Sequence, residues 1–105
     1  MDKRAVLEII AEFAEALKVE GVRPQRIILF GSHSTGTQRE DSDIDLVVIS
    51  EDFSSKGYWA RIDALSGAIA TVFQPIEAIA MTPEEWERGD SLIVDFARNG
   101  EVVYG

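Results

Sequence analysis

Two short segments of the sequence carry residue types that can hold a phosphate and a metal ion. At the first, a predicted strand runs into Gly31 and Ser32 and then into a loop rich in small residues. Glycine lets the backbone come close to a ligand, and successive backbone N–H groups can form an anion-binding nest. A helix beginning near Ser34 would direct its positive end at the same place. The segment therefore has the ingredients of a phosphate site.

The second segment contains two aspartates, Asp43 and Asp45, at the start of another predicted strand. Side chains alternate along a strand, so both carboxylates should lie on one face while Ile44 and Leu46 point into the core. Two adjacent carboxylates repel each other, and a hard cation such as Mg²⁺ relieves the repulsion and accepts oxygen ligands. The sequence thus predicts a magnesium site beside a phosphate site, as in enzymes that transfer phosphoryl or nucleotidyl groups.

Glu77 is a third candidate, because it is the one charged residue in the predicted strand 76–81. Burial of an unpaired acid is unfavourable, so a buried Glu77 would need a reason to be there. If its strand lies beside that of Asp43 and Asp45, the three acids form a cluster. Such a cluster could hold a second metal ion or accept a proton from an attacking hydroxyl. The alternative is that Glu77 faces solvent on a half-exposed strand.

Two other motif interpretations fail on single residues. The spacing from Gly31 to Gly36 imitates a P-loop, but Thr37 stands where lysine is required. The alternating aspartates 41, 43 and 45 imitate a calcium-binding loop, but Leu46 replaces the glycine of its sharp turn.

The surrounding elements follow from periodicity and from Gly and Pro breaks. Asp2 is a plausible N-cap for a helix that ends at Gly21, and Pro75 ends a second helix that begins at Tyr58. The expected apolar face of that second helix comprises Ile62, Leu65, Ile69, Val72 and Phe73. Strands are expected at 26–30, 44–49, 76–81 and, at an edge, 101–104, with a polar connection at 51–57 and short helices after 82 and 90. The order predicts one α/β domain over residues 1–105, a small mixed sheet covered by helices.

Composition narrows the possible classes. The 105 residues include 10 Lys and Arg, 19 Asp and Glu, one His and no Cys. Disulfides, thiolate nucleophiles, Cys-ligated zinc and multi-His metal sites are thereby excluded. A net charge of −9 argues against direct binding to nucleic acid and suits a basic protein partner. No apolar run is long enough for a membrane span and no signal peptide is recognised, so we expect a cytoplasmic protein.

The pattern resembles a known family. Gly31-Ser32, ten intervening residues and Asp43-Ile44-Asp45 match the signature of the DNA polymerase β-like nucleotidyltransferase superfamily. The short length, Gly36, Ser42 and the segments 82–86 and 100–104 resemble its minimal nucleotidyltransferase (MNT) branch, so most of the chain is covered.

The resemblance implies a polymerase β-like palm fold, a triphosphate bound at Gly31 and Ser32, and two Mg²⁺ ions held by Asp43, Asp45 and Glu77. Relatives usually carry aspartate as the third acid, and many carry arginine where this chain has His33. Members of the MNT branch are typically antitoxins paired with a HEPN-type toxin, and some transfer AMP from ATP to a tyrosine of that toxin.

Three functions therefore stay open from the sequence. The first is an active nucleotidyltransferase of this type. The second is a catalytically degenerate module that neutralises a partner protein by contact. The third is a small-ligand or metal-sensing domain without chemistry, which would bind nucleotide with Mg²⁺ but not turn it over. Exposed apolar residues on the helices could form a homodimer or a toxin interface.

Overall fold

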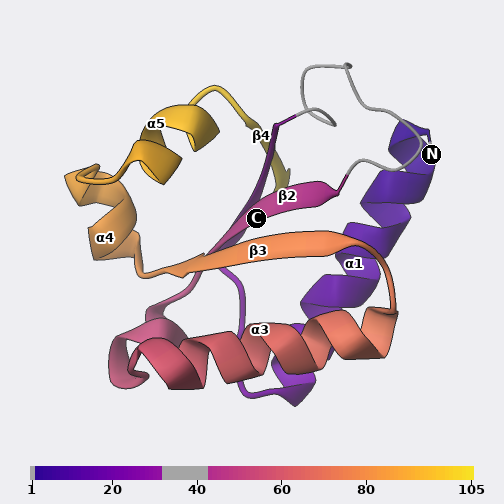
Figure 1. Ribbon diagram of the computed structural model, residues 1–105, viewed down its shortest axis with the longest axis horizontal. Helices are drawn as coiled ribbons and strands as arrows, with labels where there is room; N and C mark the ends of the chain where they lie inside the picture. The colour runs from indigo at the N-terminus through magenta and orange to yellow at the C-terminus, as the bar shows by residue number, and fades with distance from the viewer. Residues whose placement is uncertain (1, 32–42) are drawn as a thin grey trace.

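The computed structural model describes residues 2–31 and 43–105. In that part of the chain, a four-stranded sheet has the order β3-β2-β1-β4 (Figure 1). The strands are β1 (Arg26–Phe30), β2 (Ile44–Ile49), β3 (Ile76–Met81) and β4 (Glu101–Tyr104). β1 is antiparallel to both β2 and β4, whereas β2 is parallel to β3. The predicted small mixed sheet is therefore confirmed, with β3 and β4 at its edges.

Helices lie on both faces of this sheet (Figure 1). α1 (Lys3–Val19) and α3 (Tyr58–Val72) pack together on one face, and the short helices α4 (Pro83–Arg88) and α5 (Leu92–Ala97) lie on the other. The polar connection expected after β2 contains a 3₁₀ helix, η1 (Glu51–Ser55). No helix in the described part of the chain is long and apolar enough to cross a membrane.

The two faces of the sheet differ in how completely they are covered. The face under α1 and α3 carries a large buried cluster that includes Phe13, Leu17, Leu29 and Leu46. The opposite face has a smaller cluster, in which Phe30, Ile79, Trp86 and Ile93 are only partly buried. Because Val47 and Ile49 belong to the smaller cluster, alternation along β2 places Asp45 on the thinly covered face.

One helix boundary differs from the sequence prediction. Phe73 was expected on the buried face of α3, but α3 ends at Val72 and Phe73 is 88% exposed. Phe73 adopts the left-handed conformation, with φ of 58°, and its N–H donates to the carbonyl of Ile69. The residue before a proline is disfavoured in a helix, so the helix ends ahead of Pro75 although the apolar spacing continues to Phe73.

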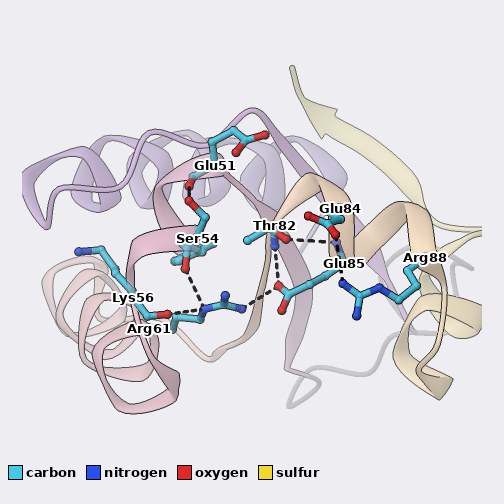
Figure 2. A network of polar contacts seen from close by, with 9 residues as sticks. Glu51, Ser54, Lys56, Arg61, Thr82, Glu84, Glu85 and Arg88 are labelled. Carbon is cyan, nitrogen blue, oxygen red and sulfur yellow. Dashed lines mark hydrogen bonds and ion pairs between the residues drawn. The ribbon is translucent and has the colours of Figure 1, made fainter.

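A polar network ties α3 to α4 at the end of β3, where Thr82 follows Met81 (Figure 2). Arg61 Nη1 lies 2.7 Å from Glu85 Oε1, and Arg61 Nε donates to the carbonyls of Phe53 and Lys56. The same Glu85 oxygen accepts from the N–H of Thr82 at 2.8 Å, while the Glu85 N–H donates to the Thr82 hydroxyl. This reciprocal capping box fixes where α4 begins after β3.

The network predicts an acid-sensitive contribution to stability. Burial raises the pKa of Glu85, but hydrogen bonds from Thr82 and the Arg61 guanidinium outweigh it, and the net shift is downward. A carboxylate with a lowered folded-state pKa stabilises the fold above its ordinary pKa, and this contribution is lost as pH falls through the folded-state value. We expect Glu85→Gln to lower the free energy of unfolding by about 0.5–1 kcal/mol at neutral pH, because glutamine keeps the capping box and loses the ion pair.

Urea denaturation at neutral and acidic pH measures this effect. The difference between wild type and Glu85→Gln should shrink as the solution is acidified. Glu84→Gln is the matched control, because the Glu84 side chain is 86% exposed and lies 3.6 Å from Arg88. That substitution should change stability by less than about 0.3 kcal/mol. An equal effect of both substitutions would contradict a specific role for the Arg61–Glu85 pair.

Candidate active site

Strand pairing brings the three predicted acids together. In the parallel ladder between β2 and β3, Asp45 lies opposite Glu77, and Asp43 precedes β2 by one residue. The negative charge of Asp43, followed by that of Asp45, raises the pKa of the Glu77 carboxyl, with a smaller contribution from burial. Electrostatic coupling of this kind requires proximity, so the acids form one cluster at the start of the parallel pair.

Glu77 reaches this cluster from the edge of the sheet and is exposed, as one of the two sequence alternatives held. Asp43 is also exposed, whereas Asp45 is half-buried between β1 and β3. Asp45 is therefore the acid most fixed by the fold, and Asp43 and Glu77 are free to approach a ligand from the solvent side.

The backbone of Gly31 lies close to the side chain of Asp45. β1 and β2 pair with Phe30 opposite Asp45, and Gly31 follows directly with a φ of +73°. A Cβ atom at position 31 would overlap Oδ2 of Asp45. The sequence indicated that Gly31 permits close approach of a ligand. The structure adds a second requirement, because the absence of a side chain leaves the Asp45 carboxylate room to lie where it does.

The rest of the predicted phosphate segment lies outside the described residues. This holds for Ser32, for His33, for the helix expected near Ser34 and for the Asp41 position. Of the two residues predicted to hold a triphosphate, the structure therefore describes Gly31 alone.

A pocket of about 430 Å³ opens beside the acids. Asp45 and Glu77 line it together with the apolar side chains of Phe30, Ile79 and Ile93, among others. These apolar residues come from β1, β3 and α5, so three elements meet around the carboxylates. The sequence marks these residues only as core positions, although Phe30 lies directly before Gly31. The pocket can hold a flat apolar group next to a charged one.

The donor chemistry of the cluster suits a magnesium ion. All three side chains offer carboxylate oxygens, and the raised pKa of Glu77 records a repulsion that a divalent cation would relieve. However, no three His, Cys, Asp or Glu residues within 2–31 and 43–105 are already arranged to hold a metal ion. The exposure of Asp43 and Glu77 makes their carboxylates accessible to an ion from solvent.

A known protein family matches most of this chain. The family model of the nucleotidyltransferase domain matches residues 9–103, which takes in β1, β2, β3, most of β4 and the acid cluster. No curated protein matches this chain.

Several solved structures share the fold. A proposed nucleotidyltransferase from Sulfolobus solfataricus superposes with a TM-score of 0.67 and 18% identity, over 91% of this chain and 77% of that one. A toxin–antitoxin crystallised with AMP-PNP gives a TM-score of 0.62 and 24% identity, over 94% and 73%. A mutant of the toxin–antitoxin MntA-HpeT gives 0.55 and 19%, over 100% and 74%. At these identities the likeness concerns the fold.

Proposed function

Because this chain belongs to the nucleotidyltransferase domain family, we propose that it transfers a nucleoside monophosphate, AMP from ATP, to a hydroxyl of a partner protein. The observation that carries the proposal is the register of β2 and β3, which sets Glu77 beside Asp45. Asp43 joins them at the start of the same strand pair, and the absence of a side chain at Gly31 leaves room for the Asp45 carboxylate.

The proposed reaction is a substitution at the α-phosphorus of ATP. The acceptor oxygen forms a bond to this phosphorus, and the bond to the bridging oxygen of pyrophosphate breaks, so pyrophosphate leaves with the electron pair. Glu77 is our candidate to take the acceptor proton, because its exposed carboxylate lies on the strand beside Asp45. Gly31 and Ser32 would hold the triphosphate through backbone and hydroxyl donors.

Mg²⁺, in our proposal two ions, would be held by Asp43, Asp45 and Glu77. When bound, it would neutralise charge on the triphosphate and lower the pKa of the acceptor hydroxyl. The protein's own contribution is to fix Asp45 on a central strand and to set the pocket of Phe30, Ile79 and Ile93 against the reacting centre.

We propose that the acceptor is a tyrosine of a HEPN-type toxin and that the chain acts as its antitoxin in the cytoplasm. Two of the similar solved structures are toxin–antitoxin pairs, one of them with AMP-PNP. The net charge of −9 suits a basic protein surface and opposes direct binding to nucleic acid.

The test uses the purified chain, Mg²⁺ and the protein encoded by the neighbouring gene. ATP labelled in the α-phosphate should transfer its label to the partner, whereas ATP labelled in the γ-phosphate should not. Removal of Mg²⁺ with a chelator should abolish transfer, and readdition should restore it. Transfer of the γ-label would indicate phosphoryl transfer, and no labelling with any nucleoside triphosphate would overturn the proposed activity.

The second candidate, neutralisation by contact alone, is favoured by Glu77, which is one methylene longer than the usual third aspartate of the family. The two candidates make opposite predictions for the double variant Asp43→Ala, Asp45→Ala. A contact module would still silence the toxin, whereas an enzyme would lose this ability while keeping its circular dichroism spectrum.

A further inference from the structure

One side of β3 is unpaired within the described chain. The N–H of Ile44 donates to the carbonyl of Pro75 at 2.8 Å, and the N–H of Ser50 donates to the carbonyl of Met81 at 3.0 Å. In a parallel ladder, alternate residues of a strand direct their N–H and C=O groups toward the partner strand. These two bonds show which residues of β3 do so, and the N–H and C=O groups of Ala78 and Ala80 point away from β2. Within residues 2–31 and 43–105, β3 pairs with β2 and with no other strand.

β3 carries few of the features that usually protect an edge strand. Natural edges are often short or carry lysine, proline or a bulge. β3 has six residues in unbroken register with β2, and Pro75 and Pro83 lie outside it. Glu77 is its one charged residue, and the rest are Ile, Ala and Met. The strand is therefore able to accept another strand along its open side.

Helix α3 borders this edge with an apolar stripe. The stripe consists of Tyr58, Ile62, Ile69 and, just past the helix end, Phe73, and the buried core residue Leu65 lies at its middle. A pocket of about 520 Å³ joins Tyr58, Ile62 and Leu65 to residues 78–80, and the pocket beside the acids joins Ile69 to residues 76–79. Figure 1 shows α3 running along the length of β3. Tyr58 and Phe73, at the two ends of the stripe, are 69% and 88% exposed.

Strand β3 and helix α3 can each pair with the same element of a second copy about one shared twofold axis. If an antiparallel second copy places its Ile79 opposite Ile79, each Ala78 faces an Ala80 as a hydrogen-bonded pair, and the open backbone groups satisfy one another. The same twofold axis passes near the middle of α3, because Leu65 lines one pocket together with residues 78–80. It would bring Tyr58 to Phe73 of the second copy, and Ile62 to Ile69 of the second copy.

We propose that the chain forms a twofold-symmetric dimer through the open edge of β3, which joins the two sheets into one. Strand and helix register agree on this partner, whereas a strand from another protein would have no reason to match both. Each copy carries a net charge of −9, so long-range repulsion opposes association. The dimer should therefore tighten as added salt screens that repulsion. The interface shares Ile79 with the pocket beside the acids, and its tests measure association of two copies and not nucleotidyl transfer.

A cysteine cross-link tests the register. The chain has no cysteine, so a single introduced thiol reports on one position. Ile79→Cys would face its own symmetry mate in a non-hydrogen-bonded pair, where the Cα atoms lie about 4.5 Å apart and a disulfide can form. Under mild oxidation this variant should give a covalent dimer. Ala80→Cys is the matched control on the same strand, and it should stay uncross-linked because residue 80 faces residue 78 of the second copy. Equal cross-linking of both variants, or none with Ile79→Cys, overturns the proposal.

Sedimentation velocity over a range of concentrations tests the helix contacts without altering the core. Phe73→Lys should raise the dimer dissociation constant by about tenfold or more, because an apolar contact is lost twice in each dimer. Val19→Lys is the control: Val19 is 85% exposed on α1, and the dissociation constant should not change. A wild-type chain that is monomeric at every concentration, or equal weakening by both substitutions, contradicts this interface. Dimerisation only with a partner protein bound would assign the edge to that partner instead.

Discussion

Asp45→Asn is expected to reduce nucleotidyl transfer by about 10³-fold while leaving the fold intact. Asp45 is the acid that the sheet holds most firmly, because its strand β2 lies between β1 and β3 and its side chain is half-buried. Asparagine has nearly the same shape but no negative charge, so it cannot balance a divalent cation. Metal-assisted charge stabilisation contributes several kcal/mol to a transition state, and each 1.36 kcal/mol corresponds to tenfold in rate.

The measurement is transfer of the α-label at saturating ATP and at increasing Mg²⁺. The variant should need more Mg²⁺ and should not regain the wild-type rate when Mg²⁺ is saturating. Asp63→Asn serves as the control, because Asp63 is an exposed aspartate on α3 and lines none of the pockets described above. Its rate should equal that of wild type. A fully active Asp45→Asn protein would remove Asp45 from the chemistry and leave the acid cluster without a proposed role.

The strands could be predicted from the sequence because local signals delimit them. Strands 26–30, 44–49 and 76–81 have the predicted bounds. Gly31, Ser50 and Pro75 each lie directly beside one of these apolar runs, so composition alone separates strand from loop. The beginnings of α4 and α5 can also be predicted from the sequence, because Thr82 and Ser91 cap these helices with side-chain oxygens.

The arrangement of the strands could not be predicted in the same way. The sequence offered Glu77 as either a buried or a solvent-facing acid, and the choice depends on whether β3 is central or at an edge. That property arises from pairing between residues far apart in the chain, which local periodicity does not encode. The exposure of Phe73 has a similar origin, since apolar spacing continues past the point where the helix ends.

Within the site, the pairing partner of Asp45 also could not be predicted from local sequence. The spacing of Asp43 and Asp45 indicated two carboxylates on one face, but only the parallel register sets Glu77 opposite Asp45. Likewise, the contact between Gly31 and Asp45 follows from the antiparallel pairing of Phe30 with Asp45. Residue types thus indicated the chemistry, and long-range register decides which atoms meet.

Gly31→Ala is expected to impair both stability and activity, because two separate constraints meet at this position. The φ of +73° is unfavourable for a residue with a side chain, by about 1–2 kcal/mol. In addition, the new methyl group would overlap Oδ2 of Asp45 and force this carboxylate to move. Displacement of a catalytic group by about 1 Å can lower a rate by about 10²-fold.

Gly21→Ala separates these two constraints. Gly21 also has a positive φ, of +87°, but nothing lies within 4 Å of a Cβ placed there. It should therefore show the conformational cost alone, about 1–2 kcal/mol in urea denaturation, with wild-type transfer of the α-label once folded. Gly31→Ala should add a loss of transfer that persists under conditions where the protein is fully folded. If both variants lose stability equally and both keep full transfer, then the position of the Asp45 carboxylate does not control the reaction, and Gly31 serves only to turn the chain after β1.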